Sequence, residues 1–457
     1  MRHLLFPVLL FSVTGLSMAQ SLPGFRPSGV FDEQQMVIEN SPADTRVLIN
    51  APLTGFGDSN RVTLVFYALP NGNTIEQTIG KRMKKGDDWH YNIQNIGAQT
   101  RFLREKIKDR TVVVAYAEAK QKSWPAWKAA TPGYQIKVNE LVEEVTALFA
   151  KWDPEIVLDG HSGGGRFIFS YLDARPEIPA DVVRIAFLDS DYGYEDSIYG
   201  PKLIRWLKKE SPGYLCTIAY NDSVALYNGK PVVSPEGGTW YHSHMMKAYL
   251  SDSFPLQERK HRPLLWYCTP DKQIEFVFRT NHRRRIYHTQ QVEYNGFIHS
   301  MLSGTAEEQR GYRYYRRRAY NHFIADSVPE PIRIMNIPAR QPYAESGTAF
   351  MSRIADLPRE QREEEIFKAI ASGNIPAFLR NTVTLHSVAR DTAGTEHHLT
   401  YEVMPDYLSV GNDTDFCRVP MNPHTSQRLA DLFGASLLTA RLSDEIYRKA
   451  QVKPEPF

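Results

Sequence analysis

A serine and a cluster of glycines separate an apolar run from an aromatic one in IVLDGHSGGGRFIF, residues 156–169. Such a cluster suits a phosphate loop, a plain chain turn or a turn that presents a nucleophile. A P-loop needs a lysine after its last glycine, where this chain has Arg166, and the glycines fit no dinucleotide-binding GxGxxG frame. Gly160, Ser162 and Gly164 do fit GxSxG, in which a sharp strand-to-helix turn raises the serine above a sheet. The spacing therefore predicts Ser162 as a nucleophile.

A nucleophilic serine requires a histidine base, which in a strand–turn–helix setting follows the serine and the acid along the chain. Among fourteen histidines, we predict His299 as the base. It follows the last strand-like run, behind Gly296, where a loop can cross the edge of a sheet. His288, inside that run, and His242 and His244, in TWYHSHMM, are weaker candidates.

The acid has four candidates. Asp222 ends the predicted strand YLCTIAYND and is favoured by strand order. Asp189 and Asp191, which follow the preceding predicted strand, and Asp271, in CTPDKQ, stay open. Each of these aspartates could instead cap a turn or a helix.

Acyl transfer also requires N–H groups that stabilise an oxyanion. Gly163 supplies the first, at the start of the predicted helix. In the loop ALPNGNTIEQ, the backbone N–H of Gly72 or Asn73 supplies the second, although an ordinary Asn-Gly turn is the alternative. This chemistry uses no cofactor and no metal.

The elements that must position these residues alternate along the chain. The helices are predicted at 96–107, 134–152, 166–174 and 201–211, and the strands at 35–40, 45–53, 61–70, 111–119, 155–160, 182–190, 214–222, 263–268 and 286–296. Such alternation predicts an α/β fold with a mostly parallel sheet and helices on both faces.

Prolines and weak periodicity mark residues 326–347 as a linker. A charged helix, a hairpin with Ala393-Gly394 near its turn, and a helix after Pro423 follow, and they predict a small α+β module over 348–457.

Residues 1–19 have a short apolar run behind Arg2 and end in small residues, which is the pattern of a secretory signal peptide. We therefore expect a secreted or periplasmic protein. No later run is long and apolar enough to predict a membrane span.

The composition limits the classes of partner and of site that the protein can have. With 457 residues, 42% of them hydrophobic, the chain can form a large core. Lys plus Arg (54) nearly balance Asp plus Glu (52), which argues against nucleic acid as the main partner. The basic stretches 281–285 and 311–323 are a solvated face or contacts for an anionic polysaccharide. Three cysteines permit at most one intrachain bridge, and they lack the CxxC spacing of a zinc site.

Over about residues 30–325 the chain resembles the α/β-hydrolase superfamily, through GHSGGG, PNGN, the ordered Asp222 and His299, and the succession of strands and helices. The resemblance implies a Ser-His-Asp hydrolase domain over 20–325 that forms an acyl-enzyme. The segment VMPDYLSVGNDTDFCRVPMNPHTSQRLADLFG resembles an uncharacterised module of exported bacterial proteins. Gly165 departs from the usual elbow, where a bulkier residue is common, and suggests tight packing there.

The hypothesis from the sequence is an exported serine hydrolase that cleaves a small-molecule or polymer-borne ester. A peptidase or amidase acting on cell-wall or secreted peptides is the second candidate. A surface-binding protein that keeps the fold without catalysis is the third.

Overall fold

The computed structural model describes residues 22–39, 41–328, 337–380, 382–390, 396–450 and 452–453. The chain divides into two compact units, Met1–Pro331 and Ile332–Phe457, so the division falls inside the segment 326–347 that the sequence marks as a linker. The predicted signal peptide, 1–19, and the predicted turn at Ala393-Gly394 lie outside the described residues.

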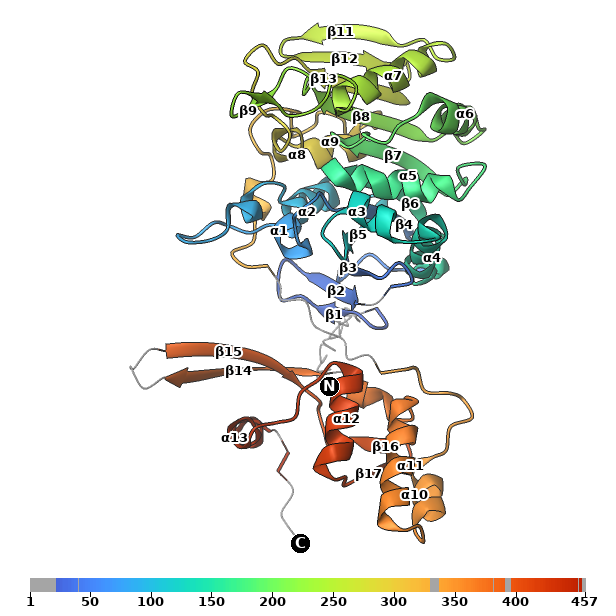
Figure 1. The fold of residues 1–457 in the computed structure, drawn as a ribbon, viewed down its shortest axis with the longest axis vertical. Coiled ribbons are helices and arrows are strands. Elements are labelled where there is room, and N and C mark those ends of the chain that lie inside the picture. The colour runs from blue at the N-terminus through green and yellow to red at the C-terminus, as the bar shows by residue number, and fades with distance from the viewer. Residues whose placement is uncertain are drawn as a thin grey trace, which may run out of the picture. The chain divides into compact units, whose positions relative to one another are not determined.

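The first unit is built on one eleven-stranded sheet, whose strands lie one beside the next in the order β1-β2-β3-β5-β4-β6-β7-β8-β13-β12-β11 (Figure 1). The strands are β1 (Arg26–Pro27), β2 (Glu33–Ile38), β3 (Thr45–Pro52), β4 (Arg61–Ala68), β5 (Arg110–Ala119), β6 (Glu155–His161), β7 (Val182–Leu188), β8 (Tyr214–Tyr220), β11 (Gln257–His261), β12 (Leu264–Cys268) and β13 (Ile274–Arg279). A two-stranded ribbon, β9 (Leu226–Tyr227) with β10 (Lys230–Pro231), follows β8.

The centre of the sheet is parallel. Strands β5, β4, β6, β7, β8 and β13 run in one direction, and the antiparallel strands lie at the two edges. The carboxyl ends of the parallel strands therefore share one edge, where loops collect side chains from several strands. The predicted α/β class with a mostly parallel sheet is confirmed.

Helices cover both faces of this sheet, because successive side chains of each strand point to opposite faces. Leu158 of β6 belongs to one apolar core and its neighbour Val157 to the other. The helices of the first core are α3 (Trp124–Ala130), α4 (Tyr134–Ala147), α5 (Gly165–Asp173), α6 (Asp196–Leu207) and α7 (Thr239–Ser251). Those of the second are α1 (Ile75–Ile79), α2 (Ile96–Lys106), α8 (Gln290–Glu293) and α9 (Gly296–Leu302).

One sequence prediction is wrong at the end of this sheet. The run 286–296 is no strand: it forms a loop and α8, and the last parallel strand is β13, Ile274–Arg279. The sequence of β13, IEFVFR, is short, and its neighbour β12 occupies the adjacent sheet position as an antiparallel strand. This shift changes which histidine follows the last parallel strand.

The second unit has its own core, which includes Phe350, Ile370 and Leu429. Its elements are α10 (Gly347–Ile354), α11 (Arg359–Ala371), α12 (Pro423–Phe433), α13 (Ala440–Lys449), the hairpin β14 (Val383–Arg390) with β15 (Glu396–Val403), and β16 (Ser409–Gly411) with β17 (Phe416–Arg418). The predicted charged helix, the hairpin and the helix at Pro423 are all present, and Gly434 ends α12 in a left-handed conformation (φ 67°).

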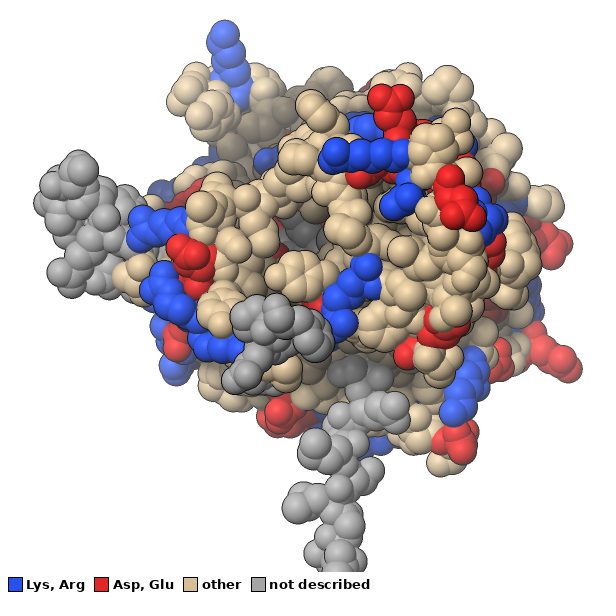
Figure 2. All heavy atoms as spheres, turned by 90° about the horizontal axis from the view of Figure 1, so that it is seen from below, with Lys and Arg blue, Asp and Glu red and all other residues tan. Residues whose placement is uncertain are grey.

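Positive and negative side chains are interspersed over the face shown in Figure 2, in keeping with the nearly balanced charge. Within the described part of the chain, no helix has both the length and the apolar character needed to cross a lipid bilayer.

Candidate active site

Ser162 lies at the sharp turn between β6 and α5. Its φ of 55° is in the left-handed region, and a short 3-10 turn, Ser162–Gly164, leads into the helix. A non-glycine residue in this conformation is strained and persists only where its surroundings hold it, as they do at functional sites. The predicted strand–turn–helix setting of Ser162 is present.

The glycines are required because the turn is packed against two neighbouring strands. A Cβ on Gly164 would overlap the carbonyl of Ala68, at the end of β4, and one on Gly160 would lie 3.0 Å from the backbone of Gly164. A Cβ on Gly165 would overlap the carbonyl of Ser190, in the loop after β7. Gly165 thus has the tight packing that the sequence suggested.

His288 is the histidine that this turn faces. The ring centroid of His161, the residue before Ser162, lies 4.5 Å from that of His288, and its Nε2 lies 3.3 Å from the His288 carbonyl oxygen. Burial lowers the pKa of His161 well below the usual range, and the nearby His288 ring lowers it further. The His161 ring is therefore neutral and serves as a packing partner beside Ser162.

A buried carboxylate orients His288. Its Nδ1 lies 2.5 Å from Oδ2 of Asp189, whose side chain is fully buried, whereas the imidazole is 22% exposed. Asp189 follows β7 directly and also has a left-handed backbone, with φ 51°. A carboxylate on Nδ1 holds the proton there and leaves Nε2 free to accept one.

Asp222 is close to this pair without contacting the histidine in any recorded hydrogen bond. Thr239, the first residue of α7, donates a hydrogen bond from its hydroxyl to Oδ1 of Asp189. The hydroxyl oxygen of Thr239 also lies 3.3 Å from Oδ2 of Asp222. The backbone N–H groups of Thr239 and Trp240 also donate to Asp222, at 2.9 and 3.3 Å. Asp222 thus caps α7 and supports Asp189 through a shared threonine.

Burial raises the pKa of Asp222 to about 6, and the charge of Asp189 adds to the rise. The N–H donors of α7 oppose this effect. Two carboxylates that share one hydroxyl repel each other when both are ionised, so one of them is held less acidic than a free aspartate.

The two remaining aspartates have other partners. Asp191 accepts a hydrogen bond from Ser243 at 2.7 Å, and burial raises its pKa well above the usual range. Asp271 is exposed in the turn before β13, at the amino end of that parallel strand, where it accepts from the N–H of Gln273.

His299 occupies a buried cluster away from this edge. Its Nε2 lies 2.7 Å from Glu275 and its Nδ1 lies 3.1 Å from the hydroxyl of Tyr312, and the side chain is fully buried. Glu275 is the second residue of β13, so this cluster lies toward the amino ends of the parallel strands, whereas Ser162 follows the carboxyl end of β6. The structure does not bring His299 to Ser162.

The other histidine candidates lie on α7. His242 lies 3.0 Å from the carbonyl of Tyr194 through Nδ1, and the His244 ring stacks on Phe278 with centroids 4.4 Å apart. Burial lowers the pKa of both.

The predicted oxyanion donors differ in whether they already have a hydrogen-bond partner. The N–H of Gly72 donates to the carbonyl of Lys122 at 2.8 Å, so it is already in use. Asn73 is buried, and its Nδ2 has no hydrogen-bond partner among the described residues. The side chain of Asn71 lies directly over Gly163, where it would overlap a Cβ. The loop after β4 thus meets the start of the helix turn.

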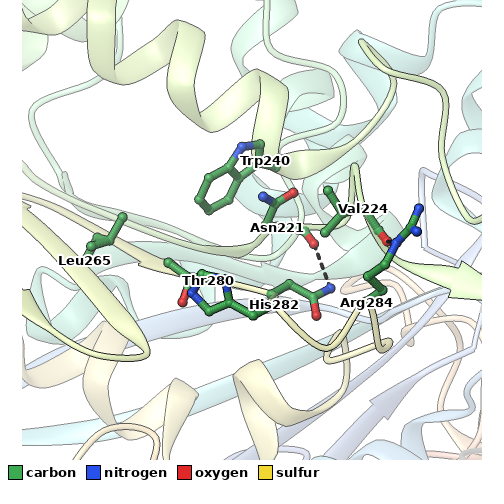
Figure 3. A pocket seen from close by; sticks show the side chains of 8 residues that line it. Asn221, Val224, Trp240, Leu265, Thr280, His282 and Arg284 are labelled. Atoms are coloured by element: carbon green, nitrogen blue, oxygen red, sulfur yellow. Dashed lines mark hydrogen bonds between the residues drawn. The ribbon is translucent and has the colours of Figure 1, made fainter.

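A pocket of about 390 Å³ opens at the same edge of the sheet, at the ends of β8 and β13 (Figure 3). Its lining includes Asn221, Val224, Trp240, Leu265, Thr280 and Arg284. The aromatic segment SWPAW, by contrast, is core: Trp124 and Trp127 of α3 are each 1% exposed.

The sequence contains a signal for His288. The run IEFVF, 274–278, is a short apolar segment of the kind that forms a buried strand. With this run as the last parallel strand, His282 and His288 are the first histidines after it. The choice among the aspartates had no such signal, because Asp189 and Asp222 end adjacent strands.

No protein-family model matches this chain, and no curated protein matches its sequence. Solved structures with similar backbones include the siderophore hydrolases EstB and EstA from Aspergillus nidulans. EstB is 13% identical (62% of this chain and 96% of that one, TM-score 0.33), and EstA is 10% identical (66% and 100%, TM-score 0.36). A feruloyl esterase module from Clostridium thermocellum is 10% identical (64% and 92%, TM-score 0.37).

The topology of the first unit can be stated from its own strands. Strand β4 lies between β5 and β6, a strained serine turn follows β6, and the loop after β13 carries a histidine bonded to a carboxylate at the end of β7. This unit therefore has the α/β-hydrolase fold that the sequence resemblance implied.

Proposed function

We propose that the protein is an exported serine hydrolase whose triad is Ser162, His288 and Asp189. The observation that carries the proposal is the 2.5 Å contact between His288 and the buried Asp189, together with the packing of the His288 ring on His161, the residue before the left-handed Ser162. This triad keeps the predicted nucleophile and replaces His299 and Asp222 by His288 and Asp189.

In this proposal His288 accepts the Ser162 proton on Nε2 as the serine oxygen attacks an acyl carbon. Asp189 stabilises the resulting imidazolium without taking its proton. The N–H of Gly163, assisted by Asn73, stabilises the oxyanion. The tetrahedral intermediate then expels the leaving group, which takes the proton from His288. In the second half of the reaction water attacks the acyl carbon as His288 accepts its proton, and Ser162 leaves and takes that proton back.

An ester is the proposed substrate because an alkoxide leaves more readily than an amine. Export rests on the leader-like residues 1–19. Comparison of 4-nitrophenyl esters with the corresponding anilides tests the choice, since a peptidase or amidase would also turn over the anilides.

A fluorophosphonate probe, which labels activated serines, tests the nucleophile and the base. We expect labelling of the wild type, none of Ser162→Ala, and a rate at least about 10³-fold lower for His288→Gln. His299→Gln is the matched control and should label at the wild-type rate if it folds, as checked by circular dichroism. Fast labelling of His288→Gln would contradict the proposed base, and an unlabelled, folded wild type would favour a binding protein.

The acid is tested by a second pair of variants. Asp189→Asn should lower kcat/KM by several orders of magnitude, because the amide presents the wrong partner to Nδ1. Asp222→Asn should have a smaller effect, since Asp222 supports the triad only through Thr239. The reverse ranking would identify Asp222 as the acid, as strand order predicts.

A further inference from the structure

The pocket at the ends of β8 and β13 lies within a substrate's length of the proposed nucleophile. Parallel strands β6, β7, β8 and β13 are consecutive in the sheet. With neighbouring strands about 4.8 Å apart, the pocket begins roughly 10–14 Å from the end of β6, where Ser162 stands. A group bound in this pocket can therefore belong to the same molecule as the scissile bond.

The pocket has both apolar and charged lining residues. Val224, Trp240 and Leu265 provide apolar and aromatic surface (Figure 3). His282 and Arg284, both exposed, come from the loop that leads from β13 to His288, and Arg284 lies beside Val224. A ligand with a flat apolar body and an anionic end matches both kinds of lining.

The positive charge beside the pocket is not neutralised by a neighbour. Arg283, Arg284 and Arg285 form no ion pair with any described residue, and all three are exposed. Arg284 uses only its Nε, which donates to the Val224 carbonyl at 3.3 Å. Its two terminal nitrogens have no hydrogen-bond partner among the described residues. Asp222, the neighbour of Asn221 in the pocket lining, is buried and already accepts from the N–H groups of α7.

The loop is held in place before any ligand arrives. Asn281, which is 5% exposed, donates to the carbonyls of Asn221 and Arg285 and accepts from the N–H of Arg285. Arg284 has a left-handed backbone (φ 52°), and its carbonyl accepts from the N–H of Leu226. A loop fixed at both ends by a buried side chain presents its arginine without a large entropic cost on binding.

We propose that this pocket binds a carboxylate-bearing group of the substrate, with Arg284 on the carboxylate and Trp240 against its apolar or ring portion. The inference rests on the proposed hydrolase function and adds the substrate class: an acidic ester. It also gives the basic stretch 281–285 a specific role in place of a general attraction to anionic polymers.

Binding to Ser162→Ala tests the pocket without relying on turnover. Calorimetry with 4-phenylbutyrate and with the neutral 4-phenylbutyramide should give a Kd at least about tenfold lower for the carboxylate. Arg284→Gln should abolish this preference, and Arg317→Gln, which removes an exposed arginine that does not line the pocket, should keep it. Equal binding of acid and amide, or a preference that survives Arg284→Gln, would overturn the proposal.

A parallel titration with trigalacturonate distinguishes two kinds of acidic ligand. This compound carries its carboxylates on sugar rings, whereas 4-phenylbutyrate carries its carboxylate on an alkyl chain with a phenyl ring. Binding of either acid that depends on Arg284 supports the pocket, and binding of neither refutes it. Fluorophosphonate labelling of the wild type and of Arg317→Gln, both with Ser162 intact, tests the hydrolase separately and should proceed at the same rate. If no protein with Ser162 intact is labelled, the proposed hydrolase function is refuted, whereas the calorimetric result still decides whether the pocket binds a carboxylate.

Discussion

At the scale of single residues, the site is organised around one hydroxyl that two carboxylates share. Thr239 donates to Asp189, which orients His288, and it lies within 3.3 Å of Asp222. The threonine thus holds Asp189 in the orientation in which it contacts His288.

Replacing Thr239 by valine should lower kcat/KM roughly tenfold, the value of one buried hydrogen bond, and should change KM little. Thr239→Ser, which keeps the hydroxyl, should restore most of the loss. Steady-state kinetics on a 4-nitrophenyl ester measures both. Ser243→Ala, which removes the partner of Asp191 on the same helix, is the control, and an equal loss there would assign the effect to general disturbance of α7.

A second residue-scale prediction concerns Asp159, which is fully buried in β6. Burial raises its pKa to about 7, against the lowering effect of the hydrogen bond from Ser300, 2.6 Å away. Because the folded pKa lies above the unfolded one, the protonated group contributes stability below about pH 4, and this contribution is lost as the pH rises through 7.

The unfolding free energy of the wild type, measured against that of Asp159→Asn, should therefore fall by about 2–3 kcal/mol between pH 5 and pH 8. Urea denaturation at the two pH values gives the difference. A constant difference across this range would mean that Asp159 is ionised in the folded protein at pH 5.

At the scale of elements, the elbow could be predicted from the sequence and the triad only in part. The GxSxG spacing predicts the position of Ser162, because the close contact of β6 and α5 with β4 leaves no room for side chains at the two glycines. The sequence predicts His299 as the base and a strand over 286–296, whereas the last parallel strand is the short β13 and the loop after it carries His288, which we propose as the base. Asp189 and Asp222 both end strands, so only the structure distinguishes the residue that contacts His288.

The packing of the elbow predicts the effect of enlarging Gly165. In Gly165→Ala the new methyl group overlaps the Ser190 carbonyl, next to Asp189, so α5 or the loop after β7 must move. We expect a loss of about 1–3 kcal/mol in unfolding free energy together with slower fluorophosphonate labelling. Gly133→Ala, where a Cβ meets nothing within 4 Å, isolates backbone strain and should leave labelling unchanged. Normal labelling of Gly165→Ala would show that the elbow tolerates the shift.

At the scale of the whole molecule, the two units have separate apolar cores, and all proposed catalytic residues lie in the first. The sequence predicted a small α+β module after residue 347 from its prolines and its change in periodicity. The role of this module could not be predicted, because its sequence contains no motif that indicates a catalytic or binding site.

Separate cores predict that damage to one unit spares the other. Ile370→Ala, in the core of the second unit, should lower its unfolding free energy by about 2–5 kcal/mol and leave labelling of Ser162 unchanged. Ile185→Ala, in the core of the first unit, should impair labelling as the temperature rises. Calorimetric scans with labelling at each temperature measure both, and loss of labelling in Ile370→Ala would show that the units are coupled.

The order of the strands also has a consequence for the thiols. Cys216 on β8 and Cys268 on β12 are buried and free, and both stand opposite Glu275 of the intervening strand β13. Two strand spacings, about 10 Å, exceed the reach of a disulfide. Cys216 and Cys268 therefore give the first unit no internal cross-link to gain in an oxidising environment and none to lose in a reducing one, so its stability should not depend on the redox state of its surroundings.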